Sequence, residues 1–431
     1  MRYLGAFLAV SIGAGALAAC SNGSSYTGLS QPVNSVKKPT TGNYRIIYSF
    51  GSAAHDGEGP IAPLINRQGV LYGTTANGGS TRCHNSEGCG TVFSVTTSGT
   101  ETILHRFGIY GDNASHPAAG LIALHGTLYG TTGNNSAQCY SSSYLSCGTV
   151  YSISRYGGYS TLHTFAGRPS DGSGPTASLV ALNGVLYGTT NYGGSAACGA
   201  YSQGCGTVFS LTPNGTEAIL HNFGGTASSG DGAIPTYNLV ALNGVFYGTT
   251  AHGGANNEGT VFSITPSGTE TVLHSFGGSG DGAIANSGLV AKNGLLYGTT
   301  SAGGTGGCGY GSIPGCGTVY SITPDGTETV LHSFVGSDGA FPWDHLVATS
   351  RVLYGTTLSG GSGSCDYFGT AGCGTVYQIT TSGVESVLHF FGGSGDGSGP
   401  GAALLRLNGV LYGTTQLGGA HNNGTVFSVT P

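Results

Sequence analysis

Charge is scarce in this chain. Asp, Glu, Lys and Arg make up 7 % of its 431 residues, whereas an average soluble domain has about 25 %. The net charge is −6 and the twelve Lys and Arg residues are scattered, so we find no basic face that could neutralise a phosphate backbone. We therefore expect no nucleic-acid partner, and a polar surface made mainly of Ser, Thr, Asn, Tyr and backbone groups.

Long apolar runs are missing beyond the first twenty residues. There, Arg2 precedes an apolar run over 6–18, and small residues follow it, as in a secretory signal peptide. The ending LAAC resembles a bacterial lipobox, in which the cysteine, here Cys20, is lipidated and becomes the new N-terminus. An ordinary signal peptide with an incidental cysteine is the alternative. No later stretch reaches the roughly 18 apolar residues that a transmembrane helix needs.

These features predict where the protein is located. We expect a lipoprotein signal peptide over 1–19, a lipidated Cys20 with a flexible Ser-, Thr-, Asn-, Gly- and Pro-rich tether over 20–43, and a folded domain over 44–431. The lipid would anchor the protein in a bacterial membrane. Because Ser21 rather than Asp follows the cysteine, the sorting rule of proteobacteria would favour the outer membrane. The domain would then lie in the cell envelope, periplasmic or surface-exposed.

Glycine, unlike charge, is abundant, and it marks an internal repeat. The chain has 83 glycines, and the string Leu-Tyr-Gly-Thr-Thr recurs along it, with Phe in place of Leu in one copy. Each copy is followed by Gly-Thr-Val and then Phe or Tyr. A repeat of about 50–60 residues indicates a solenoid or a propeller. The tyrosines of the copies are Tyr72, Tyr129, Tyr187, Tyr247, Tyr297, Tyr354 and Tyr412.

Each repeat is predicted to form four short β-strands. In the fourth repeat these are the strings NLVALN, GVFYGTT, GTVFSIT and TETVLHSF. Asn243-Gly244 joins the first two strands and is a strong hairpin signal, because both residues of a type I′ turn need a positive φ. Turns such as Pro-Ser-Gly join strands three and four. Apolar residues on both faces of the strands fit small sheets packed between neighbours, and no run has helical periodicity.

The two ends of the chain indicate how the repeats close. The string NYRIIYSF at 43–50 matches a fourth strand without its first three, and GTVFSVTP at 424–431 is a third strand without a fourth. A ring in which the N-terminal strand completes the last blade leaves few exposed sheet edges. We predict an all-β fold, a seven-bladed β-propeller of four-stranded antiparallel blades over 44–431.

The repeat differs from common propeller signatures, since it has no Trp-Asp dipeptide and no kelch spacing. The ordered strings Leu-Tyr-Gly-Thr-Thr, Gly-Gly, Gly-Thr-Val-Phe-Ser and Leu-His-Ser-Phe resemble the Gloeo/Verruco (GloVer) tandem-repeat family over 44–431. The resemblance implies an exported or surface bacterial protein whose anchor, which varies between members, is here the lipobox. It implies no activity and no catalytic residues. The sixth repeat departs from the pattern with Ser350-Arg351 where Asn-Gly is usual, which predicts a less tight hairpin.

Ten cysteines besides Cys20 fall as five close pairs, each between strands two and three of one blade. Blades four and seven lack cysteine, and their loops shrink to GGANNEG and GGAHNNG. Cysteines that accompany only the long loops indicate local disulfides, which an oxidising, extracytoplasmic location permits. Zinc is the alternative, but a single pair lacks the two further ligands of a tetrahedral site. The pairs are Cys83/Cys89, Cys139/Cys147, Cys198/Cys205, Cys308/Cys316 and Cys365/Cys373.

Two ionisable sets recur through the blades. A histidine occupies one position of strand four, where the N-terminal strand has Tyr48, and its repetition favours a structural hydrogen bond over a catalyst. An aspartate lies in each crossover between blades, where Asx-type turns explain it; calcium, which needs six to eight oxygen ligands, is the alternative. The two sets could bond to each other. They are His105, His163, His221, His274, His332 and His389, and Asp56, Asp112, Asp171, Asp231, Asp281, Asp338 and Asp396.

In a four-stranded meander, the crossovers and the loops between strands two and three emerge on the same face. Binding sites favour variable loops on a rigid scaffold, and these loops carry Tyr140, Tyr144, Tyr201, Tyr310, Tyr367 and Phe368. The crossovers end in P-x-x-x-L with small residues in most blades, but blades four to six have PTYNL, ANSGL and PWDHL. Trp343 is the only tryptophan; it either binds a ligand or fills a packing gap. The candidate binding residues are Trp343, Asp344, His345, Tyr237, Asn238, Asn286 and Tyr367.

No catalytic motif accompanies these residues. The sequence has no nucleophile elbow, no His-Glu-x-x-His and no Gly-rich phosphate loop. It therefore favours a monomeric binding or scaffold module for a glycan or an envelope protein, with no cofactor or metal. The alternative is a carbohydrate-active hydrolase or lyase that uses Asp344 and His345, with a second acid from a loop such as the one with Asp366.

Overall fold

The computed structural model describes residues 43–80, 88–108, 114–133, 147–154, 156–196, 198, 203–224 and 230–431. They all belong to one compact unit, Lys37–Pro431. Every regular element among them is a β-strand. Within the described part of the chain, no helix has the length and apolarity needed to cross a membrane.

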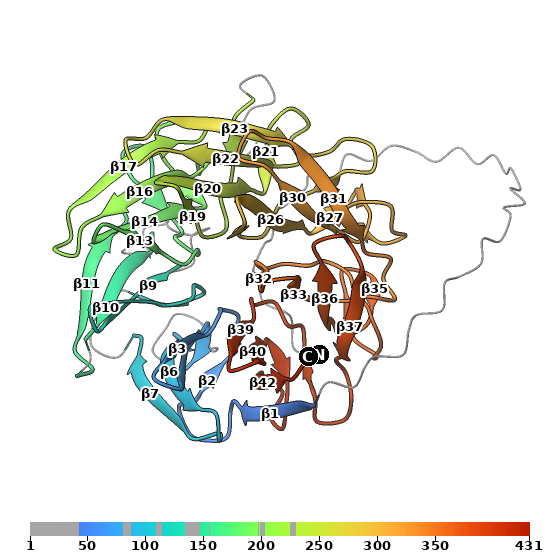
Figure 1. Ribbon diagram of the computed structural model, residues 1–431. Helices are drawn as coiled ribbons and strands as arrows, with labels where there is room; N and C mark the ends of the chain where they lie inside the picture. The colour runs from blue at the N-terminus through green and yellow to red at the C-terminus, as the bar shows by residue number, and fades with distance from the viewer. Residues whose placement is uncertain are drawn as a thin grey trace, which may run out of the picture. The chain divides into compact units, whose positions relative to one another are not determined.

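The main strands form seven antiparallel sheets of four, set around a ring as the blades of a propeller, with strand one innermost and strand four outermost (Figure 1). Blade 1 consists of β3 (Ile65–Arg67), β4 (Val70–Thr75), β6 (Thr91–Thr96) and β7 (Glu101–Arg106). Blade 2 consists of β8 (Ile122–Leu124), β9 (Thr127–Thr132), β10 (Thr149–Ile153) and β11 (Tyr159–Thr164). Blade 3 consists of β13 (Val180–Leu182), β14 (Val185–Thr190), β16 (Thr207–Leu211) and β17 (Glu217–Asn222). Blade 4 consists of β19 (Val240–Leu242), β20 (Val245–Thr250), β22 (Thr260–Ile264) and β23 (Glu270–Ser275). Blade 5 consists of β25 (Val290–Lys292), β26 (Leu295–Thr300), β30 (Thr318–Ile322) and β31 (Glu328–Ser333). Blade 6 consists of β32 (Val347–Ala348), β33 (Val352–Thr357), β36 (Thr375–Thr380) and β37 (Glu385–Phe390). Blade 7 consists of β39 (Leu405–Leu407), β40 (Val410–Thr415), β42 (Thr425–Val429) and β1 (Tyr44–Ser49).

The ring closes through the two ends of the chain. Strand β1 pairs antiparallel with β42, from Tyr44 opposite Val429 to Ser49 opposite Thr425. The predicted seven-bladed propeller, completed by the N-terminal strand, is therefore confirmed. Because the first and last strands share one sheet, every blade has two neighbours and its faces are covered.

Both turn residues of the inner hairpin have a positive φ in six blades, four of them with the predicted Asn-Gly and two with Gln68-Gly69 and His125-Gly126. Asn243 and Gly244 have φ angles of 54° and 80°, as a type I′ turn requires. Blade 6 differs, since β32 has two residues where the other innermost strands have three. There the Thr349 hydroxyl and backbone N–H both donate to the Val352 carbonyl, at 2.8 and 2.9 Å. In blade 6 the Thr349 side chain therefore reinforces the hairpin, whose turn residues are Ser350 and Arg351.

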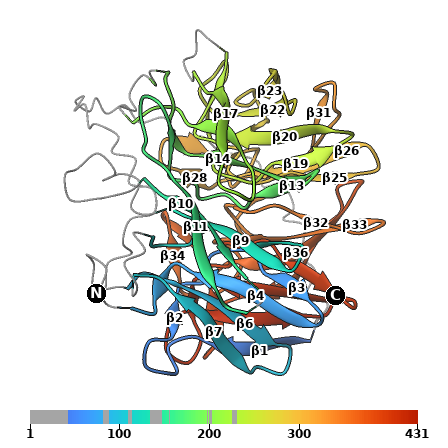
Figure 2. The same cartoon turned by 90° about the vertical axis from the view of Figure 1, so that its left-hand side faces the viewer.

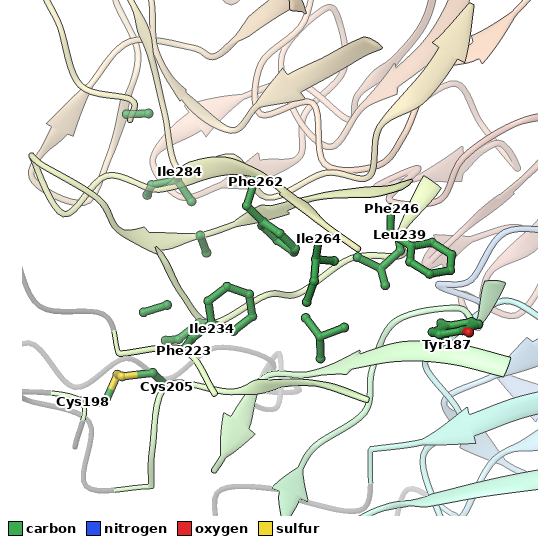
Figure 3. Packing of buried hydrophobic residues seen from close by; sticks show 14 of the residues in the cluster. Tyr187, Cys198, Cys205, Phe223, Ile234, Leu239, Phe246, Phe262, Ile264 and Ile284 are labelled. Atoms are coloured by element: carbon green, nitrogen blue, oxygen red, sulfur yellow. A yellow bond between two sulfur atoms is a disulfide. The ribbon is translucent and has the colours of Figure 1, made fainter. Parts of the chain in front are cut away.

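The apolar core lies between neighbouring blades. Figure 3 shows the layer between blades 3 and 4, where Phe223 meets Phe262 edge to face with ring centroids 5.1 Å apart. The same aromatic pair recurs at all seven blade interfaces, at 5.0–5.2 Å. This packing explains the repeated glycine of Tyr-Gly-Thr-Thr: a Cβ on Gly188 would lie 2.7 Å from the ring of Phe209. The repeat string is therefore a packing motif.

The two threonines of the repeat string tie strands and blades together. The hydroxyl of Thr190 lies 2.8 Å from that of Thr207 on the neighbouring strand, and each blade has this pair. The hydroxyl of Thr189 donates to the carbonyl of Tyr237 in the next crossover, at 3.1 Å. Five more blades repeat that second bond. In blade 5 the equivalent hydroxyl, on Thr299, has no partner among the described residues.

The crossovers and the loops after strand two lie side by side, as predicted for a meander. Small two-stranded sheets join them: β2 (Gly57–Glu58) with β5 (Asn77–Gly78), β12 (Gly172–Ser173) with β15 (Tyr192–Gly193), β18 (Gly232–Ala233) with β21 (His252–Gly253), β24 (Gly282–Ala283) with β27 (Ala302–Gly303), and β38 (Gly397–Ser398) with β41 (Leu417–Gly418). Two loops add hairpins of their own, β28 (Gly309–Tyr310) with β29 (Ile313–Pro314) and β34 (Asp366–Tyr367) with β35 (Thr370–Ala371). We call this side the loop-rich face and the opposite side the turn face; Figure 2 shows β28 and β34 at one edge and the β25 and β32 hairpins at the other.

Candidate functional site

The long loops of the loop-rich face are held by local disulfides. Cys198–Cys205, Cys308–Cys316 and Cys365–Cys373 are bonded within their own blades, with Cα atoms 4.8–5.1 Å apart. Cys89 and Cys147 are also disulfide-bonded, and their expected partners Cys83 and Cys139 lie outside the described residues. Cys20, Asp112, Tyr140, Tyr144 and Tyr201 lie outside them as well. Disulfides on these loops restrict their conformations, which is favourable for a binding surface.

The repeated histidines and aspartates contact each other. His274 Nε2 lies 3.0 Å from Asp281 Oδ2, and four further blades have the same contact at 3.0–3.4 Å. The other aspartate oxygen accepts a hydrogen bond from the N–H of the following glycine; for example, the Gly282 N–H donates to Asp281 Oδ1 at 2.6 Å. Each such aspartate therefore fixes the start of a crossover to the end of strand four, which is a structural role.

A glutamate from the next blade approaches four of these pairs. His332, Asp338 and Glu385 present three possible ligand atoms within 4.8 Å of one another, and three other interfaces repeat the group. Three atoms are fewer than the six to eight oxygens that calcium takes. Burial, and then the charge of Asp338, raise the pKa of Glu385 to about 8. At neutral pH the glutamate is therefore mostly protonated, and the repulsion between two close carboxylates is relieved.

The crossover ends of blades 4 to 6 meet beside the start of the innermost strands. A Cβ on Gly288 would lie 2.6 Å from Asn238 Oδ1 and 3.2 Å from His345 Cβ, so these three residues of consecutive blades are in contact. The sequence placed Asn238 and His345 in one site, and the structure brings them together around a glycine.

Asp344 connects two blades. It is buried, with 7 % of its surface exposed. One oxygen accepts the Ala403 N–H of the next crossover at 2.7 Å, and the other accepts the His345 N–H at 2.6 Å and lies 2.8 Å from His345 Nδ1. Asp344 therefore orients His345 and the crossover into blade 7, while Asp366, the second acid of the hydrolase hypothesis, is exposed on β34.

Of three other predicted residues, Asn286 and Tyr367 are buried and Tyr237 is half-buried. Asn286 is buried, and its side-chain oxygen accepts the Thr236 hydroxyl at 2.6 Å. Tyr367 is buried, and its hydroxyl lies 3.4 Å from Ser398 Oγ. Burial raises the pKa of Tyr237 well above its ordinary value, and the nearby Asp344 adds to the shift. Asn286 and Tyr367 thus bond to crossover residues inside the protein.

Four aromatic side chains gather on the loop-rich face over blades 5 and 6. Phe368, in the β34–β35 turn, has its ring centroid 4.9 Å from Tyr310 of β28, 5.9 Å from Phe341 and 6.0 Å from Trp343. Tyr310 also meets Phe341, at 5.7 Å. Two disulfide-held loops and one crossover thus supply a continuous cluster, which we call the aromatic patch.

Phe368 is the exposed member of the aromatic patch. Half of its surface is accessible to solvent. Its φ angle is 55°, in the left-handed region that bulky residues rarely adopt. Phe368-Gly369 occupies the turn position where the inner hairpins have Asn-Gly. Buried Ile234, Ile284 and Phe341 adopt a similar φ, so the feature that sets Phe368 apart is its exposure.

Comparisons with known proteins address the family. The model of the Gloeobacter/Verrucomicrobia repeat matches residues 33–202, 148–313 and 309–431. The chain belongs to this repeat family. No curated protein matches it.

Solved structures share the fold of this Gloeobacter/Verrucomicrobia repeat protein. The WD40 domain of Pan2 from Neurospora crassa matches 90 % of this chain and 95 % of that domain, at 10 % identity and a TM-score of 0.50. A gluconolactonase from Xanthomonas campestris matches 76 % of this chain and 96 % of that one, at 12 % identity and a TM-score of 0.40. At this identity the Pan2 domain indicates only the shared propeller architecture.

Sequence reasoning placed Trp343 among the candidate binding residues but not its neighbours in the aromatic patch. Phe341 stands where blades 4 and 5 have Ile234 and Ile284, so the repeat assigns it to the core. Tyr310 and Phe368 were visible only as loop aromatics. The one available signal was Phe368-Gly369 between two cysteines, which suggests a tight turn with an aromatic at its tip.

Proposed function

We propose that this Gloeobacter/Verrucomicrobia repeat protein is a cell-envelope binding module that holds a glycan at the aromatic patch. The observation that carries the proposal is the half-exposed Phe368 beside Trp343, on loops fixed by the Cys308–Cys316 and Cys365–Cys373 disulfides. Aromatic faces suit the C–H faces of sugar rings. His345, whose side chain is about a quarter exposed, lies in the same crossover and offers a hydrogen-bonding group.

A binding role also fits the hydrogen bonds that Asp344 makes. Both oxygens of Asp344 accept hydrogen bonds from the protein itself. Such a carboxylate is suited to fixing a crossover. A rigid propeller with aromatics on one face provides the preorganisation that favours weak-ligand binding.

The test is a screen of glycans and peptidoglycan fragments against the purified full chain, followed by calorimetry with each hit. Trp343→Ala and Phe368→Ala should each weaken binding at least about tenfold, as aromatic hot spots do. Tyr156→Ala is the matched control, because Tyr156 is 82 % exposed in the turn between β10 and β11.

Three results would contradict the proposal. One is glycan binding that neither patch variant weakens. The second is turnover of a polysaccharide that Asp344→Asn abolishes, which would favour the hydrolase or lyase. The third is capture of an envelope protein, without any glycan binding, that Phe368→Ala abolishes, which would assign the patch to a protein partner.

We further propose that the module is lipid-anchored through Cys20. The disulfides are consistent with an extracytoplasmic protein, and the LAAC string supplies the lipidation site. Cys20→Ser should leave the protein uncleaved or soluble after cell fractionation. Unchanged membrane partitioning of the variant would rule the anchor out.

A further inference from the structure

Cations collect around the channel on the turn face. Each blade contributes one inner hairpin there, and together these hairpins contain no Asp or Glu. Four of them carry a cation, and they belong to the consecutive blades 5, 6, 7 and 1. The four residues are Lys292, Arg351, Arg406 and Arg67. In a protein of net charge −6, this arc is a local region of positive potential.

A cavity of about 570 Å³ lies in the middle of this arc, between the innermost strands of blades 6 and 7. Val347–Ser350 line one side and Leu404–Arg406 the other. The short strand β32, which ends at Ala348, belongs to the side that blade 6 contributes. The departure from Asn-Gly that the sequence shows in the sixth repeat therefore coincides with the cavity.

Two arginines at the cavity are available to a ligand. Arg406 lines it and Arg351 follows the lining residue Ser350, and both side chains are exposed. Across the described ranges, neither guanidinium has a hydrogen bond or an ion pair with the protein. Arg67 at the end of the arc, by contrast, donates to the Gly126 carbonyl at 3.2 Å.

The chemistry of the site selects the ligand. A guanidinium pairs best with a carboxylate or a phosphate, through two parallel hydrogen bonds. The cavity volume lies in the range of small-molecule sites, about 300–1,000 Å³. We propose that this cavity binds a small oxyanion, the carboxylate or phosphate group of a compact ligand, with Arg406 and Arg351 as its binding residues. The site is on the opposite face from the aromatic patch and does not depend on the glycan proposal.

Calorimetric titration of the purified full chain at low ionic strength tests this site. The probes are sodium phosphate and sodium glucuronate, with neutral glucose as the control ligand. One saturable site for at least one oxyanion is expected, with no response to glucose. Whichever oxyanion binds more tightly identifies the source as a phosphate or a sugar acid.

Variants separate charge from shape. Arg406→Gln and Arg351→Gln should each weaken binding at least about tenfold, whereas Arg45→Gln, which removes an exposed arginine from β1 at the rim, should leave it unchanged. Ala348→Leu keeps every charge but narrows the cavity, and it should also weaken binding. Circular dichroism checks the fold of each variant. The proposal is overturned if neither oxyanion saturates, or if Arg45→Gln weakens binding as much as the other arginine variants.

Discussion

The hydroxyl of Tyr48 donates a 2.9 Å hydrogen bond to Oδ2 of Asp56, in the strand that closes the ring. In five other blades a histidine contacts the crossover aspartate from the same position, as His389 contacts Asp396 at 3.0 Å. Tyrosine and histidine both offer a donor group of similar reach and an aromatic ring, and Tyr48 meets Phe50 edge to face as His389 meets Phe391. The repeat therefore retains the bond between strand four and the crossover together with this ring contact.

This role predicts a stability loss when the aspartate is removed. Asp171 accepts the N–H groups of Ala166 and Gly172, at 2.8 and 2.6 Å, and lies 3.3 Å from His163 Nε2. Asp171→Ala should lower the free energy of unfolding by about 2–4 kcal/mol, because hydrogen bonds to a buried charge are lost together. Urea unfolding measures the change. Asp325→Asn is the control and should change it by less than about 0.5 kcal/mol, because an asparagine side-chain oxygen can accept the same turn hydrogen bond, as Asn214 does from Thr212.

A pH dependence follows from the glutamates between blades. The folded protein holds the proton of Glu385 up to a pKa of about 8, while the ordinary value is 4.5. The folded state thus binds more protons between these values, and its stability falls as pH rises through that window. Glu385→Gln, which cannot ionise, should be more stable than the wild type at about pH 9, by about 1–3 kcal/mol, and should differ least at about pH 4.

Chemical unfolding at several pH values measures this difference. Asp366→Asn, at an exposed position, serves as the control and should show no such trend. Equal stability of Glu385→Gln and wild type at both pH extremes would mean that the glutamate is not desolvated in the folded protein.

Because each disulfide lies within one blade, we predict that removing one loosens a single loop and leaves the propeller folded. Peptide mapping without reductant should recover the five within-blade pairs and no free thiol in 44–431. The double variant Cys365→Ser/Cys373→Ser should lose roughly 2–3 kcal/mol in the chain-entropy model and bind glycan more weakly, because Phe368 lies between these cysteines. Its circular dichroism spectrum should stay that of a propeller. A bond between cysteines of different blades would refute this arrangement.

The fold was predictable because its signals are local and repeated. Asn243-Gly244 defines a hairpin by itself, and the unmatched strands at the two ends require closure. The side-chain directions at the crossovers were not predictable. Tyr237 and Asn286 break the repeat as Trp343 does, but the sequence does not tell that Asn286 is buried while Tyr237 and Trp343 are partly exposed.

The distribution of charge also required the structure. Lys292 and Arg67 are far apart in sequence and were counted as scattered, although the ring places their blades three steps from each other around the channel. Phe341 is fully buried, as a residue at the position of Ile234 and Ile284 is expected to be. It contributes to the aromatic patch because the β34–β35 turn folds Phe368 over it, a contact between residues of two different segments.

Fluorescence of the single tryptophan tests the central claim most directly. The full chain is titrated with the tightest-binding glycan of the screen while the emission of Trp343 and its quenching by acrylamide are recorded. If the aromatic patch holds the ligand, emission shifts to shorter wavelength and quenching falls, with the same midpoint as in calorimetry, and Phe368→Ala moves both midpoints to higher concentration. If a saturating glycan changes neither emission nor quenching, the ligand binds elsewhere and the account is wrong.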